Sequence, residues 1–570
     1  MSTILNSWKE IAAYLRTSVR TVQRWERSEG LPVRRHSHGN GGTVWANSED
    51  LDQWLSGRSR PAEALPARRR APALWLILAA ILAAATLMFW LAVPSGGAIT
   101  TLAVLPFATE GSDPNAEYLG EGLAESLTRG LSHMDGLRVK VLAQTAVARL
   151  GKPPGDVREA GRLLHVDAIL SGRVAQRDDS LTVHVELVRV DDQTLLWSDR
   201  FDTRMAEVPN LQDEIARRIA ARLHLRLART GRPPGKAQTT SAEAHRDYLR
   251  GRYHWNRRTA GGIDRAIQYF ESAIAADPGY ALAYAGLAES YAVRSYYKAV
   301  APGESARRSM AAARKAIELD SSISEAWNAL AYMKSDYEWQ WEIADQHFQR
   351  ALALDPNNAT AHHWFSEHLA ALGRFDEEQR EIERAADLDP LSLIIANNLG
   401  HVWYFRRRME EAAAIYRKTM DEFPQLPNAH QDLGKVYLAQ GRYRDAIREF
   451  KRAHSLSGTP LHEGLLGLAH GLAGDTETAR GMETSLLRRR RQEYVSPYVM
   501  ALLAMGLREN SRAVEWLEKA AEERTPTLKW IGVDPMFDSL RGEPRFRAIL
   551  ERMGLPIRIA ALPSGPVGMP

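Results

Sequence analysis

Polar and basic side chains that can contact DNA are concentrated near the start of the chain. Arg and Gln side chains donate hydrogen bonds to base edges, and Ser and Thr hydroxyls bind phosphate oxygens. The candidate DNA-contacting residues are Thr17, Ser18, Arg20, Thr21, Gln23, Arg24, Arg27, Arg34, Arg35 and His36. Their chemistry suits the recognition of a nucleic-acid duplex, provided that the local structure presents them on one surface.

Two short helices are expected to position most of these side chains. Ser7 and Glu10 form a capping box, which begins the first helix. In the second helix Val19, Val22 and Trp25 recur at helical spacing, so the Arg, Gln and Thr residues between them face outward. Two short helices joined by a tight turn, the second apolar inside and basic outside, are typical of a helix-turn-helix.

A hairpin and a closing helix follow. Residues 33–38 and 43–46 are extended segments around a Gly-rich turn, which predicts a hairpin that holds its basic residues against the DNA backbone as a wing. Residues 48–55 predict a capped helix. The strings EIAAYLRTSVRTVQRWERSEGLPVRR and SEDLDQWL, in this order, resemble the winged helix-turn-helix of the MerR/excisionase type. The resemblance implies DNA binding through residues 7–57, usually as a dimer; the alternative is a helical module with a solvated basic face.

The charge distribution also favours a nucleic-acid partner for this module. The net charge is +4 over 570 residues. Residues 1–70 hold 12 Lys and Arg against 7 Asp and Glu, whereas the remaining residues hold 62 against 63. A basic excess confined to one small module indicates nucleic acid or anionic lipid as its partner. The chain has no Cys, which excludes disulfides and thiolate chemistry.

One long apolar run separates this module from the rest of the chain. Residues 73–93, ALWLILAAILAAATLMFWLAV, contain no charge, Pro or Gly, and as a helix they span about 30 Å. The run predicts a single transmembrane helix after a linker at 58–72; the alternative is a buried core helix. Flanking basic residues, here Arg68–Arg70, favour the cytoplasmic side. We therefore expect a single-pass protein of the bacterial inner membrane, with a cytoplasmic amino terminus and periplasmic carboxy-terminal domains.

Residues 99–228 alternate strand and helix patterns, which predicts an α/β or α+β domain. Strands are expected at 99–107, 137–142, 168–174, 181–190 and 194–201, and helices at 118–131, 157–164 and 211–225. The phrases LAVLPF, YLGEGLAESLTRGL, HVDAILSGRV and VELVRVDDQTLLWSDRFD resemble the TolB-like amino-terminal domain. The resemblance implies an interaction module without catalytic residues. Asp167, Asp191 and Asp192 are interpreted as turn and strand-end residues rather than metal ligands.

From residue 240 to 560 the chain is helical and periodic. Related segments place an Asp at the same position, and the steps between them are 43, 35 and 34 residues: Asp277, Asp320, Asp355 and Asp389. A period of 34 resembles tetratricopeptide repeats, here about six to nine units, with a closing helix at 533–553. Such arrays expose a concave groove, so we expect a protein or peptide partner.

No catalytic, cofactor or metal site is predicted. His362, His363 and His368 lie five and six residues apart, which does not match the i, i+4 spacing of a helical metal site. Gly231–Lys236 is too short for a phosphate-binding loop, and Ala237 stands where such a loop needs Ser or Thr. We therefore expect neither an enzyme nor a cofactor.

Taken in order, the predicted parts form a multidomain protein. They are a winged helix-turn-helix (1–57), a linker (58–72), a transmembrane helix (73–93), a TolB-like α/β domain (99–228) and an all-α tetratricopeptide solenoid with a cap (240–560). The layout is similar to ToxR/CadC-type transmembrane regulators, although the DNA-binding head, residues 1–57, looks excisionase-like. The expected function is transcription regulation by a membrane-bound DNA-binding protein that senses a partner. A homodimer is the expected assembly. The alternative is a membrane-tethered scaffold whose head does not regulate transcription.

Overall fold

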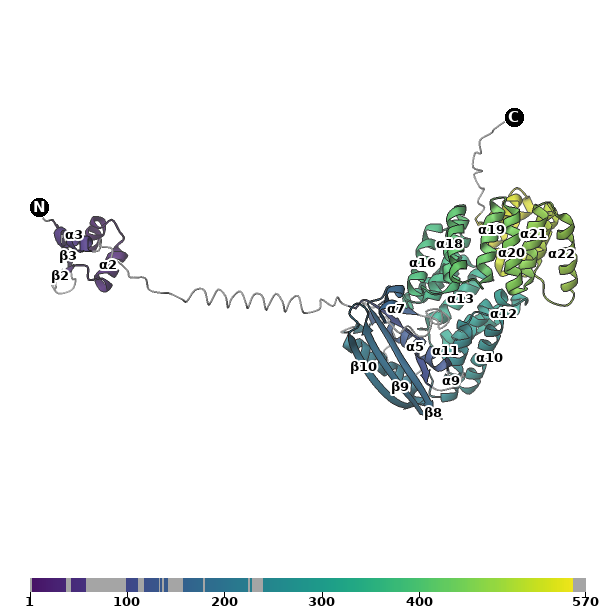
Figure 1. The fold of residues 1–570 in the computed structure, drawn as a ribbon, viewed down its shortest axis with the longest axis horizontal. Helices are drawn as coiled ribbons and strands as arrows, with labels where there is room; N and C mark the ends of the chain where they lie inside the picture. Colours follow the sequence, from purple (N-terminus) through teal and green to yellow (C-terminus); the bar gives the residue numbers. More distant parts are fainter. Residues whose placement is uncertain are drawn as a thin grey trace, which may run out of the picture. The chain divides into compact units, whose positions relative to one another are not determined.

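The chain forms two compact units, unit 1 (Met1–Gly96) and unit 2 (Gly97–Pro570). The structure is a computed structural model, and its elements are labelled in Figure 1. It describes residues 3–36, 43–57, 99–110, 117–132, 134–135, 138–141, 157–177, 180–223, 226–227 and 239–556. The predicted linker and apolar run (58–93) therefore lie outside the described residues.

Unit 1 contains the two short helices, the hairpin strands and the closing helix that its sequence predicts. The helices are α1 (Trp8–Tyr14), α2 (Val19–Ser28) and α3 (Ser48–Gly57), and the strands are β1 (Ile4–Leu5), β2 (Arg34–His36) and β3 (Thr43–Asn47). The sheet has the order β1-β3-β2 and is antiparallel throughout. Strand β1 was not expected, because two residues are too few to show an alternating pattern.

Side-chain caps and a small apolar core fix the geometry of unit 1. The Ser7 hydroxyl accepts a hydrogen bond from the Glu10 amide at 3.2 Å, as a capping box requires, while the Glu10 carboxylate accepts from the Asn6 amide. Ile11, Val22 and Leu51, one from each helix, are fully buried together. Because each helix contributes to one core, the outer face of α2 has a fixed orientation relative to the hairpin.

The first part of unit 2 is a mixed sheet with helices. Its strands are β4 (Thr101–Val104), β5 (Ala108–Glu110), β7 (Arg138–Val141), β8 (Ala168–Arg177), β9 (Ser180–Arg189) and β10 (Leu195–Arg204), in the order β10-β9-β8-β4-β7 with β5 beside β8. Its helices are α5 (Glu117–Ser132), α7 (Val157–Leu164) and α8 (Val208–Arg222), with a turn of 3₁₀ helix, η2 (Met205–Glu207), before α8. A short pair, β6 (Met134–Asp135) with β11 (Arg226–Leu227), completes it. The predicted α/β alternation is confirmed.

Antiparallel helix pairs make up the rest of unit 2 (Figure 1). They are α9 (Ala242–Asn256), α10 (Ala260–Ala276), α11 (Ala281–Tyr297), α12 (Pro302–Leu319), α13 (Ser324–Asp336), α14 (Trp341–Leu354), α15 (Ala359–Ala371), α16 (Phe375–Leu388), α17 (Leu393–Phe405), α18 (Met409–Glu422), α19 (Pro427–Ala439), α20 (Tyr443–Ser457), α21 (Pro460–Leu472), α22 (Thr476–Arg489), α23 (Pro497–Gly506) and α24 (Asn510–Glu522). Two 3₁₀ turns, η3 (Pro526–Trp530) and η4 (Pro535–Leu540), and α25 (Pro544–Met553) end the array. The predicted all-helical repeat solenoid is confirmed.

Glycines allow the helices within a pair to pack closely. A Cβ atom on Gly400 would lie 2.3 Å from the Tyr416 ring, and one on Gly434 would lie 2.5 Å from the Phe450 ring. Both rings are fully buried. The odd-numbered helices α9 to α19 also contact one another in succession, so they form the inner layer of the solenoid.

The structure corrects the predicted localisation. Within the described residues, no helix combines the length and the apolar character needed to cross a bilayer. Helix α12, for example, has 18 residues but includes six charged side chains, because it needs a polar face toward solvent. The described residues, which do not include the run at 73–93, thus contradict the prediction of a single-pass inner-membrane protein with periplasmic carboxy-terminal domains. No membrane anchor enters the function proposed below.

Candidate nucleic-acid interface and partner groove

The outer face of α2 presents three arginines at helical spacing. Arg20, Arg24 and Arg27 follow the i, i+4, i+7 pattern and are exposed, and no ion pair joins them to a described carboxylate. The Ser18 hydroxyl caps α2 by accepting from the Thr21 amide at 3.2 Å, and the two hydroxyls lie 2.8 Å apart. Unpaired guanidinium groups on an exposed helix face are available to phosphates and base edges.

Two candidate residues on the hairpin have contacts within the protein. The Arg35 guanidinium lies 2.8 Å from the Glu26 carboxylate, and Arg34 lies over the Trp45 ring at 5.3 Å. Both arginines remain exposed, so the contacts orient them without burying them. The backbone of His36 pairs with Thr43 in the hairpin. Thus β2 brings its basic residues beside α2 through the Arg35–Glu26 ion pair.

The turn before α2 holds one exposed arginine that the sequence prediction did not include. Arg16 lies in the turn between α1 and α2, is exposed, and has a φ of 49°. It stands four residues before Arg20 in the sequence, outside α2, in the turn that leads into that helix. Its position outside both helical patterns concealed it. Gln23 and Thr17 are partly exposed in the same region.

In unit 2 part of the inner layer of the solenoid, at α13, α15 and α19, is covered by the chain itself. The C-terminal groove segment, Thr525–Arg541, contacts α13 and α15 through η3 and α19 through η4. The Tyr404 hydroxyl donates to Asp534 at 2.7 Å, and Arg407 pairs with Asp538 at 2.8 Å. A groove that the sequence assigns to a partner thus already holds part of this chain.

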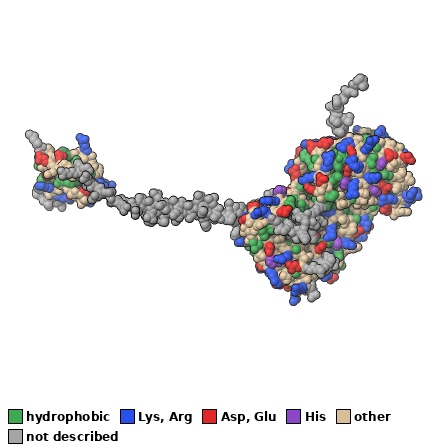
Figure 2. All heavy atoms as spheres, in the orientation of Figure 1, with side chains coloured by type: hydrophobic (Ala, Val, Ile, Leu, Met, Phe, Trp, Pro, Cys, Tyr) green, Lys and Arg blue, Asp and Glu red, His purple; other side chains and the backbone are tan. Residues whose placement is uncertain are grey.

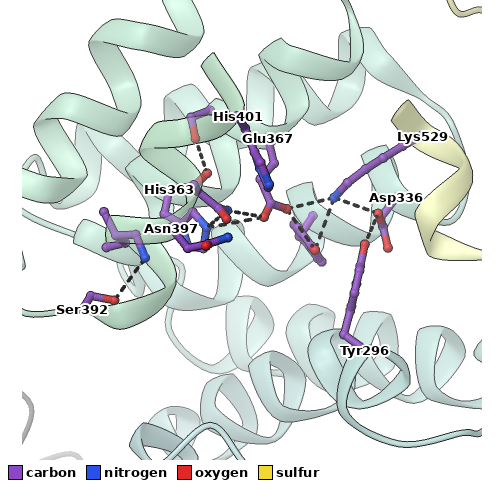
Figure 3. Close-up of polar contacts among 12 residues, drawn as sticks. Tyr296, Asp336, His363, Glu367, Ser392, Asn397, His401 and Lys529 are labelled. Carbon is purple, nitrogen blue, oxygen red and sulfur yellow. Dashed lines mark hydrogen bonds and ion pairs between the residues drawn. The ribbon is translucent and has the colours of Figure 1, made fainter. Parts of the chain in front are cut away.

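Lys529 anchors that segment (Figure 3). Its side chain is 1% exposed, and its Nζ lies 2.9 Å from both Asp336 and Glu367. Burial alone would lower the pKa of Lys529, but the two carboxylates hold it above its ordinary value. Tyr296 donates its hydroxyl to Asp336 at 2.9 Å, and the Lys529 ammonium lies 4.5 Å from the centre of the Tyr332 ring. No sequence pattern indicated this cluster, because its members are up to 233 residues apart.

The histidines and aspartates considered as metal ligands have structural partners. His362 binds Glu381, and His368 binds Ser335 at 3.0 Å, both within or beside their own repeat. Asp167 accepts from the Thr100 and Thr101 amides, and these hydrogen bonds lower its pKa against the effect of burial. Within the described residues no group of three or more metal-ligating side chains could hold an ion.

Positive and negative side chains are interspersed on the visible face of unit 2, as Figure 2 shows. This mixture agrees with the near balance of charges after residue 70. A surface of mixed charge gives no single-sign field to attract DNA. Because positive and negative charges nearly balance after residue 70, the basic excess belongs to the first 70 residues of the sequence.

Two segments match known protein families. Residues 98–218 match the second domain of the HilA/YgeH-like transcriptional regulators, and residues 406–455 match the tetratricopeptide repeat. The chain therefore contains a regulator-type domain followed by tetratricopeptide repeats. The family found for the α/β domain differs from the TolB-like domain that the sequence resembles.

Individual relatives also match parts of the chain. The chain is 27% identical over 188 residues to "Putative adenylate cyclase 3" of Rhizobium meliloti (strain 1021), covering 33% of this chain and 32% of that protein. It is 26% identical over 215 residues to "Superkiller protein 3" of Schizosaccharomyces pombe (strain 972 / ATCC 24843), covering 38% and 13%. The solved structure of Pseudomonas aeruginosa pilF is 22% identical, with a TM-score of 0.29, covering 37% of this chain and 92% of that one.

The chain spans less than a third of the length of these curated relatives. One of them carries the name of a cyclase, whereas the matched repeats belong to a class that acts by binding partners. The expectation that this chain is not an enzyme therefore stays a prediction.

Proposed function

We propose that this protein is a DNA-binding transcriptional regulator whose repeat array binds a protein or peptide partner. Helix α2 contacts the major groove through Arg20, Arg24 and Arg27, with Gln23 for base readout. The hairpin residues Arg34, Arg35 and His36 contact the backbone. Thr17, Ser18 and Thr21 bind phosphates at the start of α2.

The row of unpaired arginines on α2 carries this proposal. Three exposed guanidinium groups that pair with no described carboxylate repel one another and contribute nothing to the core, so a structural role does not explain them. The regulator-type domain at residues 98–218 supports the same conclusion independently. The proposal has three finer parts. They are the likeness of the head to the MerR/excisionase type, the TolB-like features of the α/β domain, and DNA binding by two copies.

Selection from random DNA duplexes by the full chain, followed by fluorescence anisotropy on an enriched site, tests the proposal. We expect the Arg20→Ala, Arg24→Ala, Arg27→Ala triple variant to bind that site at least 100-fold more weakly, since each such side chain contributes about 1–3 kcal/mol. For every arginine that binds a phosphate in the parent, its replacement should also reduce the slope of log affinity against log salt by about 0.9.

A matched control separates this effect from a change in total charge. Arg350, Arg417 and Arg452 are exposed on α14, α18 and α20. Replacing all three with Ala removes the same charge and should leave DNA affinity within twofold of the parent. If the α2 variant and the control bind alike, or if no duplex is enriched, the DNA-binding role is refuted. The protein is then better described as a repeat scaffold.

A further inference from the structure

A cavity of about 180 Å³ lies where the α/β domain meets the inner layer of the solenoid. Helix α5 forms one wall with Glu121 and Glu125, and α9 with the turn after it forms another with Arg252 and Arg258. The loop before α17 contributes Asp389. In another protein, an engineered cavity of about 150 Å³ binds benzene. By that comparison, this cavity has room for a molecule of about six to ten nonhydrogen atoms.

Most charges around the cavity are already matched. Arg252 pairs with Glu125 at 2.6 Å and with Glu289 at 2.7 Å. Arg129 pairs with Glu325 at 3.0 Å and donates to the Tyr248 hydroxyl at 2.8 Å. These ion pairs join α5 to the first repeats, so their role is structural.

Glu121 is the first of two exceptions. Its residue is 8% exposed, it lines the cavity, and no hydrogen bond or ion pair joins it to any described residue. Its charged neighbours are Glu117 and Glu125 on α5 and Arg257 on the facing turn, and Arg257 itself pairs with Glu117. An ionised carboxylate with so little exposure to water and no partner in the described chain costs free energy, so this position favours a cation from outside the chain.

A second acid faces the same space. The Ser392 amide donates to the Asp389 backbone carbonyl at 3.2 Å, and the Asp389 Oδ1 atom is buried and has no partner in the described part of the chain. Arg258 is a cation whose charge lowers the pKa of Asp389, and its guanidinium lies 3.6 Å from the centre of the Trp255 ring. Burial raises the pKa of Asp389 to about 7 and that of Glu121 to about 8.

Other ligand classes fit less well. The amides at the start of α15 and α17 are capped by Asn358 and Ser392, so they are not open to an anion. A metal ion would need at least three suitable ligands, and no such group occurs among the described residues. An apolar molecule would leave Glu121 unpaired. The remaining class is a small organic cation.

We propose that this cavity binds a small organic cation, an alkylammonium or guanidinium compound, with Glu121 as the main counter-ion and Asp389 as the second. The ligand would contact both α5 and the loop before α17. It would therefore stabilise the arrangement of the regulator-type domain against the repeats. The proposal goes beyond DNA binding and does not depend on it.

Isothermal titration calorimetry of the full chain with three molecules of one length tests the proposal: n-butylamine, 1-butanol and butyrate. The amine should bind at least tenfold more tightly than the alcohol, and the acid should bind least. Binding of the amine at pH 7 should also release about one proton, because Glu121 is protonated in the empty cavity and must ionise to bind a cation. Titrations in buffers of different ionisation enthalpy measure that release.

Three variants complete the experiment. Glu121→Gln mimics the protonated acid and should fold, yet it should weaken amine binding at least tenfold and abolish proton release. Asp389→Asn should weaken binding by a smaller factor. Glu477→Gln changes an exposed carboxylate on α22 and should have no effect. Absence of amine binding at 10 mM, preference for butyrate, or an unchanged affinity in the Glu121→Gln variant would each overturn the proposal.

Discussion

At the scale of residues, Glu121 should determine part of the pH dependence of stability. Its pKa is raised from 4.5 to about 8 by burial, so the folded chain keeps a proton that the unfolded chain loses. The free energy of unfolding should therefore fall by about 1.4 kcal/mol per pH unit between about pH 5 and pH 8 on account of this group. Glu289 and Asp389, whose pKa values are raised to about 7, act in the same direction.

The Glu121→Gln variant isolates this contribution. Gln does not ionise, so the variant should gain stability relative to the parent as the pH rises, with the largest gain above pH 8. Urea unfolding followed by circular dichroism at pH 5.5, 7.0 and 8.5 measures the difference. For the Glu477→Gln control, the free energy of unfolding plotted against pH should run parallel to that of the parent. A Glu121→Gln curve parallel to the parent would mean that Glu121 is ionised or paired in the native protein.

At the scale of elements, close helix pairing in the repeats should depend on glycine. A Cβ at Gly434 would lie 2.5 Å from the fully buried Phe450 ring, so α19 and α20 would have to separate. We expect Gly434→Ala to lower the free energy of unfolding by about 1–3 kcal/mol, the usual cost of overpacking.

Gly481 on α22 supplies the matched control for that substitution. Nothing lies within 4 Å of a Cβ placed there, so Gly481→Ala should stabilise the chain by about 0.5–1 kcal/mol through helix propensity. Thermal unfolding of both variants gives the comparison. Equal effects of the two substitutions would contradict the packing explanation.

The elements themselves were largely predictable from local patterns. The helix predicted at 157–164 has the same limits in the structure as α7, and the predicted turn residues Asp191 and Asp192 lie between β9 and β10. These features depend on periodicity and turn residues that are adjacent in sequence.

The cavity and the occupied groove could not be predicted in this way. The sequence pattern does not distinguish Glu121 from the other acidic residues of an amphipathic helix. That Glu121 has no partner among the described residues depends on where α9 and α17 lie. The sequence pattern shows Lys529 only as a polar residue near the end of the repeats, because the carboxylates that bind it, Glu367 and Asp336, lie 162 and 193 positions earlier. Both depend on contacts between elements far apart in the chain, which periodicity does not specify. The arginine row on α2 was predicted because all its members belong to one helix.

At the scale of the whole molecule, Lys529 joins the end of the chain to its middle repeats. Its removal should leave Asp336 and Glu367 buried without their cation, and breaking such a buried pair costs about 3–5 kcal/mol. We expect Lys529→Met to lower the free energy of unfolding of unit 2, measured in urea, by that amount. Lys451→Met, which changes an exposed lysine on α20, should leave it unchanged.

A combined variant then distinguishes charge from shape. Adding Asp336→Asn and Glu367→Gln to Lys529→Met removes the two stranded charges, so at least half of the stability should return. Unit 1 has a separate core, so its DNA affinity should stay within twofold in every variant. If the triple variant is no more stable than Lys529→Met, the lysine acts through packing of its aliphatic stem. If DNA affinity falls with unit 2 stability, the two units are coupled, and the solenoid supports DNA binding directly.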